Sequence, residues 1–80
     1  MINLLVTGGC GFIGSNFINY IFERNKYNIY NLDAMYYCAN ENNVKLSMRQ
    51  SNNYKLIKGN LRDINLIKFI LNEYNIQEVI

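Results

Sequence analysis

The sequence contains no His, no Pro and no Trp, and it has only two cysteines, Cys10 and Cys38. Without His, no mixed Cys/His ligand set for zinc can form, and two thiols are too few for a disulfide framework. We therefore expect neither a metal site nor a disulfide-stabilised secreted domain. The expected compartment is the reducing cytoplasm.

Strong charge and long apolar runs are also missing. The net charge is only +2, and the basic residues between Arg24 and Lys68 are mixed with acids, so we expect no nucleic-acid partner. No segment approaches the roughly 18 apolar residues that cross a bilayer, which predicts no membrane association. The apolar run at the N-terminus lacks the basic residues and the cleavage site of a secretory signal.

The first half of the chain changes from a strand pattern to a helix pattern and back. Residues 2–6 are mostly apolar, as in a buried parallel strand, and residues 27–32 predict a second strand that Asp33 closes. Between them, residues 12–24 predict a helix. Its expected apolar face consists of Ile13, Phe17, Tyr20 and Ile21.

The second half repeats this alternation after a long connection. Residues 34–52 predict a connection with at most one short helix near residues 44–48, and residues 54–58 predict a third strand. A helix is expected over 62–74, with Asn60 or Asp63 near its start, and residues 78–80 begin a fourth strand. The expected apolar face of this helix consists of Ile67, Ile70, Leu71 and Tyr74.

Strands alternating with helices predict an α/β fold, a doubly wound parallel sheet of the Rossmann type. Only the first half of such a sheet is present in residues 1–80. A chain this short buries only about three-fifths of its unfolded surface, and its last strand would leave an unpaired edge. We therefore expect residues 1–80 to be the N-terminal part of a larger domain, with a substrate domain elsewhere.

The stretch TGGCGFIGS places Gly8, Gly11 and Gly14 between the first strand and the first helix. In a nucleotide-binding turn, the first Gly permits the reversal, the second lets the backbone approach a pyrophosphate, and the third lets helix and strand pack closely. The backbone N–H groups of Phe12 and Ile13 would face the phosphates at the positive end of the helix dipole. No Lys-Ser/Thr pair follows, which excludes a P-loop.

Asp33 lies 19 residues after Gly14, at the end of the second strand. A dinucleotide-binding fold places a carboxylate there for the adenosine ribose hydroxyls, and this carboxylate repels a 2′-phosphate. Because Ala34 follows instead of Arg or Lys, the pattern favours NAD over NADP. The simpler alternative is that Asp33 only caps a helix or forms a turn. We interpret Cys10 as a small filler within the turn and not as a reactive thiol.

The chain closely resembles the nucleotide-sugar 4,6-dehydratases in three motifs, VTGGCGFIGSNF, NLD and YKLIKG. A Tyr followed by a small residue and Asn, between the last two motifs, also fits this family. This family belongs to the extended short-chain dehydrogenase/reductase superfamily, and the resemblance covers essentially all 80 residues. By matching position, it implies three groups of NAD contacts. They are Gly8, Gly11, Phe12, Ile13 and Gly14 around the pyrophosphate, Asp33 at the ribose, and Ala34, Met35, Tyr36, Asn60 and Leu61 at the adenosine end.

Two segments depart from the family pattern. Residues 59–61 read GNL where the family usually has GDI. The carbonyl of Asn60 can still accept from the adenine amino group, so we expect weaker but not lost binding. The pair Tyr37 and Cys38 is closer to the UDP-glucose enzymes of UDP-rhamnose synthesis than to the dTDP-glucose enzymes, which leaves the nucleotide base of the substrate open.

The resemblance implies a lyase activity, in which a homodimer converts dTDP-glucose or UDP-glucose to its 4-keto-6-deoxy sugar with bound NAD. It also implies that the catalytic groups, a Tyr-x-x-x-Lys pair and an Asp-Glu pair, lie beyond Ile80. We therefore predict no catalytic residue and no turnover for residues 1–80 alone. A nucleotide-sugar 4-epimerase and a non-catalytic NAD-binding regulatory protein share the same turn and remain alternatives.

Residues 1–80 on their own are expected to be poorly stable, because half of the predicted sheet is missing and the chain ends on the apolar Val79 and Ile80. Thermal unfolding followed by circular dichroism should give a broad transition without cooperativity. A sharp transition from a monomeric 80-residue chain would contradict this expectation.

Overall fold

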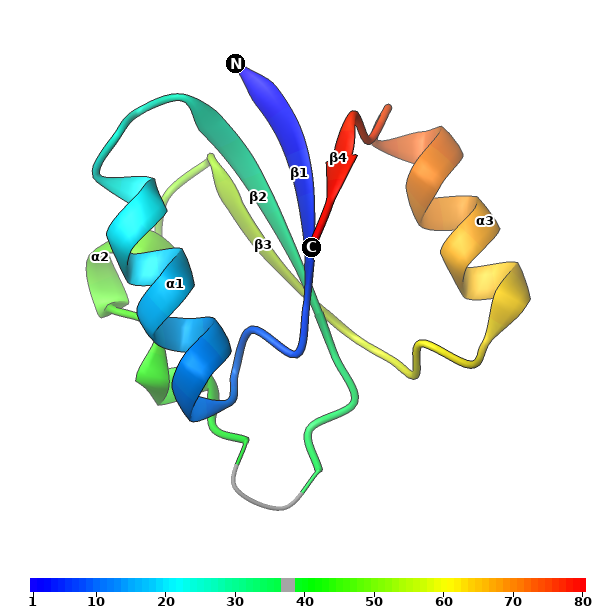
Figure 1. Cartoon of the computed structure of the whole chain (residues 1–80), viewed down its shortest axis with the longest axis horizontal. Coiled ribbons are helices and arrows are strands. Elements are labelled where there is room, and N and C mark those ends of the chain that lie inside the picture. Colours follow the sequence, from blue (N-terminus) through cyan, green and yellow to red (C-terminus); the bar gives the residue numbers. More distant parts are fainter. Residues whose placement is uncertain (37–38) are drawn as a thin grey trace.

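The computed structural model of the protein describes residues 1–36 and 39–80. Four parallel strands form one sheet in the order β3-β2-β1-β4, with helices on both sides (Figure 1). This arrangement confirms the predicted first half of a Rossmann-type sheet. The strands are β1 (Ile2–Thr7), β2 (Tyr27–Asp33), β3 (Tyr54–Lys58) and β4 (Glu78–Val79), and the helices are α1 (Phe12–Phe22), the 3₁₀ helix η1 (Glu41–Asn43), α2 (Leu46–Arg49) and α3 (Ile64–Glu73).

Two apolar clusters hold the layers together, one on each face of the sheet. Because side chains alternate along a strand, Leu4 and Val6 of β1 face α1 and α2, whereas Leu5 faces α3. Figure 1 shows α1 and α2 together on one side and α3 alone on the other. The central strand β1 is buried on both faces at Leu4, Leu5 and Val6, as its mostly apolar sequence predicted.

Helix α1 is rotated relative to the prediction and is shorter. Ile18 and Ile21 are buried, whereas Ile13 and Tyr20 are 83% and 62% exposed, so the predicted face was partly wrong. The rotation follows from Gly14, whose backbone packs against Gly8 and Gly9. Ile18 and Ile21 lie on the same face of the helix as Gly14 and therefore point toward the sheet. The helix ends at Phe22 and not at residue 24, because Asn25 adopts a left-handed conformation with φ of 56°.

Helix α3 begins at Ile64, two residues later than predicted, because Asp63 caps it. The Asp63 carboxylate accepts a hydrogen bond from the backbone N–H of Leu66 at 3.1 Å. Ile70 is fully buried against the sheet, and Tyr74 stacks on Tyr30 of β2 with ring centroids 4.5 Å apart. Leu71, expected on the apolar face, is instead exposed.

The connection after β2 contains one more short element than predicted, namely η1 in addition to α2. Val44 and Met48 anchor this segment in the cluster beneath α1. Tyr37 and Cys38, which were compared with the UDP-glucose enzymes, lie outside the described residues. Within 1–36 and 39–80, no helix has both the length and the apolar character needed to cross a membrane.

The glycine turn between β1 and α1 brings backbone against backbone. Gly8 has a φ of +70°, which confirms the predicted reversal. A Cβ on Gly14 would lie 2.3 Å from the carbonyl oxygen of Gly8, which confirms the predicted close packing. Gly9 was not predicted to matter, yet a Cβ there would lie 2.3 Å from Oδ1 of Asn31. At Gly11 the nearest atom would be 3.5 Å away, an ordinary contact.

We expect Gly14→Ala and Gly9→Ala to lower the free energy of unfolding of the complete protein by about 2 kcal/mol or more each, since the neighbouring atoms would have to move. Gly11→Ala is the matched control and should cost less than about 1 kcal/mol. Denaturant unfolding measures all three. An undisturbed Gly14→Ala variant, or a Gly11→Ala variant as unstable as the others, would contradict this account.

Candidate functional site

Two adjoining cavities lie where β1, β2 and β3 end. One, of about 290 Å³, is bordered by the end of β1, the glycine turn and Asp33. The other, of about 380 Å³, extends past Met35 to Lys58 at the end of β3. The carboxyl edge of a parallel sheet is where folds of this type bind ligands. The lining brings together seven of the predicted site residues: Gly8, Asp33, Ala34, Met35, Tyr36, Asn60 and Leu61.

The other four predicted residues, Gly11 to Gly14, form the start of α1 beside these cavities. Gly11 is the N-cap residue and has no side chain to cap the first N–H groups of the helix. The first turn also carries no acidic residue. The positive end of the helix dipole is therefore not compensated from within α1, which suits a phosphate group.

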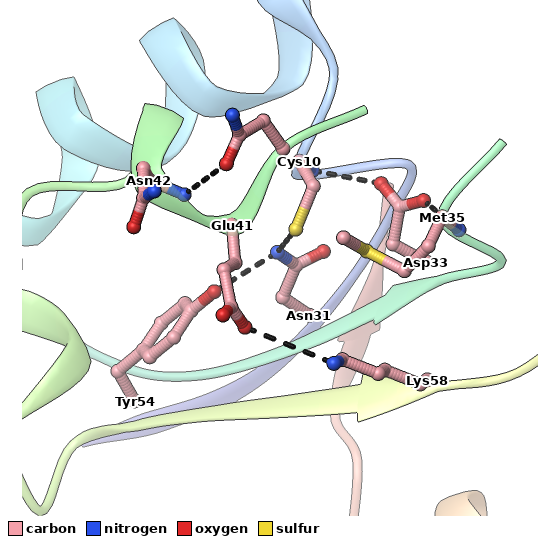
Figure 2. A network of polar contacts seen from close by, with 9 residues as sticks. Cys10, Asn31, Asp33, Met35, Glu41, Asn42, Tyr54 and Lys58 are labelled. Carbon is pink, nitrogen blue, oxygen red and sulfur yellow. Dashed lines mark hydrogen bonds and ion pairs between the residues drawn. The ribbon is translucent and has the colours of Figure 1, made fainter. Parts of the chain in front are cut away.

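The preceding amides of the turn already have partners in the protein. Gly9 N–H donates to Oδ1 of Asn31 at 2.9 Å. Cys10 N–H donates to Oδ2 of Asp33 at 2.8 Å (Figure 2). Gly11 N–H donates to the carbonyl of Gly8 at 3.3 Å. These bonds fix the turn, so an incoming anion would meet the amides at the beginning of α1.

Asp33 holds two segments in place. Besides accepting from Cys10, its carboxylate accepts from the backbone N–H of Met35 at 2.7 Å, and the residue is only 6% exposed. Asp33 is thus a turn former, as the simpler alternative supposed. A carboxylate has about four acceptor positions, so two remain for ribose hydroxyls at the cavity. The structural and the binding roles are compatible.

Met35 has a left-handed backbone with φ of 60°, which is uncommon for a residue other than Gly, Asn or Asp. Its hydrogen bond to Asp33 holds this conformation. As a result, the chain turns away from the sheet directly after β2 and forms one wall of the larger cavity. Strained backbone of this kind concentrates at binding sites.

Asn60 joins the opposite wall to this segment. Its Nδ2 donates to the hydroxyl of Tyr36 at 2.6 Å, and its Oδ1 accepts from the backbone N–H of Arg62 at 2.8 Å. Tyr36 and Leu61 are largely exposed beside it. The Asn60 carbonyl, expected to accept from adenine, is therefore already engaged by one bond and has one remaining acceptor position.

The prediction from sequence missed Asn31 and Tyr54, which lie beneath the glycine turn. Both are buried, and Nδ2 of Asn31 donates to the hydroxyl of Tyr54 at 3.0 Å (Figure 2). The signal was available, because Asn31 lies two positions before Asp33 in an otherwise apolar strand end and so shares its face of the sheet.

One Tyr-x-x-x-Lys pair does occur in the chain, formed by Tyr54 and Lys58. The two residues lie on β3, where positions four apart are separated by about 13 Å, whereas on a helix they would be neighbours. Burial raises the pKa of Tyr54, and Lys58 pairs with Glu41 at 3.9 Å. A tyrosine that transfers protons needs a pKa near the working pH, so this pair does not suit that chemistry.

The GDP-mannose 4,6 dehydratase family model matches residues 5–80 of the chain. The chain belongs to this family. The match covers nearly the whole chain. It agrees with the resemblance to nucleotide-sugar 4,6-dehydratases that the sequence motifs showed. The glycine turn and β2 lie within the matched residues.

Individual relatives agree with this assignment. A crystal structure of dTDP-glucose 4,6-dehydratase from Bacillus anthracis in complex with NAD is 41% identical, with a TM-score of 0.92, over 99% of this chain and 25% of that one. The dTDP-glucose 4,6-dehydratase of Haemophilus influenzae is 36% identical over 92% of this chain and 22% of its own length. A trifunctional UDP-glucose 4,6-dehydratase, epimerase and reductase of Arabidopsis thaliana is 36% identical over 86% of this chain and 10% of its own. The chain thus spans a quarter or less of these proteins.

Cys10 lies within the site, but its thiol has low reactivity. It is fully buried, and burial, followed by the negative charge of Asp33, raises the pKa of its thiol above the ordinary value of 9.0. Any lowering by the helix start is outweighed. This agrees with the interpretation of Cys10 as a filler.

We expect iodoacetamide at pH 8 to modify Cys10 at least about tenfold more slowly in the native protein than in urea, because the reactive thiolate is suppressed. Above pH 9.0 the thiol of the unfolded chain ionises before that of the native protein, because burial raises the native pKa. The contribution of the neutral thiol to the free energy of unfolding is therefore lost as the pH rises toward the native pKa. Mass spectrometry of the peptide that carries Cys10 measures the rates. Equal rates in both states would contradict this expectation.

Proposed function

We propose that this chain forms the NAD-binding N-terminal part of a nucleotide-sugar 4,6-dehydratase. The observation that carries the proposal is the uncapped start of α1 directly beside the buried carboxylate of Asp33, at the carboxyl edge of a parallel sheet. The likeness to the NAD complex from Bacillus anthracis supports it.

The described residues fit such a cofactor. Gly11 presents a bare backbone at the helix start. Among the described residues a Cβ there would meet one atom, at 3.5 Å, so no contact within this part of the chain requires Gly at this position. A close approach by a pyrophosphate supplies a reason. The backbone N–H groups of Phe12 and Ile13 would hold the phosphates, and Gly8 and Gly14 shape the turn.

The remainder of the cofactor would extend along the two cavities. Asp33 would accept from the adenosine ribose hydroxyls. The adenine would lie against Ala34, Met35 and Tyr36 on one side and Asn60 and Leu61 on the other. The combined hollow is of a size common for ligand sites.

The charges around the ribose position favour NAD over NADP. A 2′-phosphate would approach the Asp33 carboxylate and would be repelled by it. Lys58 is the basic residue that lines the larger cavity, and its ammonium group pairs with Glu41 at 3.9 Å. That pairing reduces its attraction for a phosphate.

NAD, when bound, supplies a hydride acceptor for oxidation of the sugar at C4. The residues of this chain would bind and orient the cofactor, whereas the groups that move protons would lie outside residues 1–80. For the complete protein we propose a homodimer in the cytoplasm that acts on dTDP-glucose or UDP-glucose. The relatives with similar sequences include enzymes named for each of these sugars.

The complete protein, given UDP-glucose or dTDP-glucose without added NADH, should yield a 4-keto-6-deoxy sugar, identified by mass spectrometry. Recovery of a C4 epimer would move the assignment to the 4-epimerases. NAD binding without turnover of either sugar would favour the regulatory alternative.

The cofactor site itself is tested by Gly11→Val. A bulky side chain at the helix start should weaken NAD binding at least about tenfold by displacing the pyrophosphate. Gly11→Ala, with its smaller side chain, serves as the control for folding. Unchanged NAD affinity in a folded Gly11→Val variant would mean that the turn has a structural role only.

A further inference from the structure

Asn31 is a fully buried polar residue at the centre of a network beneath the glycine turn (Figure 2). Its Oδ1 accepts from Gly9 N–H at 2.9 Å, its Nδ2 donates to the Tyr54 hydroxyl at 3.0 Å, and Nδ2 also lies 3.5 Å from Sγ of Cys10. Burying an amide costs free energy unless its hydrogen bonds are made. The network satisfies both ends of this side chain.

The network links three separate segments. Asn31 belongs to β2, Gly9 to the turn before α1, and Tyr54 to β3. The side chain of Asn31 also occupies the space that a Cβ of Gly9 would need, since this Cβ would lie 2.3 Å from Oδ1 of Asn31. The position of the turn is therefore determined by Asn31 through both a hydrogen bond and direct contact.

Asn31 and Asp33 act on consecutive amides. They lie two positions apart on β2 and point to the same face of the sheet, where they accept from Gly9 and Cys10 respectively. Together they hold the peptide groups that lead into α1. Small shifts of these groups would move the N–H groups of the helix start, which is the part of the turn without a side-chain cap.

Gly9 determines which way the Asn31 amide faces, because its backbone N–H can only donate and therefore requires Oδ1 on its side. Nδ2 then faces Tyr54, whose hydroxyl accepts its hydrogen and supports the side chain from β3. Burial raises the pKa of Tyr54 above its ordinary value of 10.0, so the hydroxyl remains protonated at neutral pH. Removing this hydroxyl would leave the sulfur of Cys10, a weak acceptor, as the one partner of Nδ2 among residues 1–36 and 39–80.

We propose that Asn31, supported by Tyr54, is a positioning residue that holds the glycine turn in the conformation that binds the cofactor's pyrophosphate. The proposal rests on the proposed NAD-binding function. It assigns to Asn31 no contact with the cofactor. Its effect should be largest at the pyrophosphate, because among the described residues Asn31 and Tyr54 bond the turn directly, whereas the wall at Met35 is reached only through Cys10 and Asp33.

The test compares two ligands on the complete protein after removal of any bound nucleotide. ADP-ribose contains the pyrophosphate, whereas adenosine does not, and ligand-observed NMR and calorimetry give both dissociation constants. A residue with a general structural role would weaken both ligands alike. A residue that positions the turn would weaken ADP-ribose alone.

Two variants remove the network in steps. Asn31→Leu, similar in shape, should weaken ADP-ribose at least about tenfold and adenosine less than about twofold. Tyr54→Phe keeps the ring and removes only the hydroxyl, and it should weaken ADP-ribose about threefold to fivefold, so it tests the proposal even if Asn31→Leu does not fold. The effects of the two changes should not add, since both act through one network.

Two substitutions of the same residue types serve as controls, one on β2 and one directly after α3. Asn28→Leu alters β2 at a half-buried Asn that bonds Asn3, and Tyr74→Phe alters a Tyr packed on the opposite face of the sheet. Both should leave the ratio of the two affinities unchanged. Equal weakening of both ligands by the Asn31 and Tyr54 variants, or no weakening, would overturn the proposal. If the unaltered protein binds neither ADP-ribose nor NAD, the proposed function itself fails, and this inference with it.

Discussion

Helix α1 packs with the backbone of Gly14 directly against the backbone of Gly8 and Gly9. No Cβ fits between them, so the helix starts immediately above the end of β1. This one contact sets the rotation of α1, which turns Ile18 and Ile21 into the core, and it also sets where the first amides of the helix point. Core packing and the proposed binding of an anion thus depend on the same bare backbone.

The amides of the turn fall into two groups with different uses. Those of Gly9, Cys10 and Gly11 are bonded within the protein, two of them to side chains of β2. Those at the start of α1 have no side-chain cap. Preorganised donors of this kind need little rearrangement when an anion binds, which reduces the entropic cost of binding. The sheet thereby stiffens a loop that would otherwise be mobile.

The sequence was sufficient for the order of strands and helices, because apolar runs and helical spacing are local signals. It was also sufficient for the backbone roles of Gly8 and Gly14 and for the position of Asp33 at the end of β2, whereas the binding role of Asp33 stays a prediction. It was insufficient for the face of α1, since Ile13 and Tyr20 have helical spacing yet are exposed once Gly14 fixes the rotation. Asn31 was missed because its partners Gly9 and Tyr54 lie 22 and 23 residues away in the chain, and its place two positions before Asp33 was the one local signal.

The two acceptor residues on β2, Asn31 and Asp33, lie two positions apart, which is the repeat at which side chains on a strand return to the same face. Insertions into the long connection after β2 would lengthen a loop at small cost. One extra residue between Asn31 and Asp33 would instead turn one of them to the opposite face of the sheet. The number of residues between Asn31 and Asp33 is therefore as strictly constrained as the identity of these two residues.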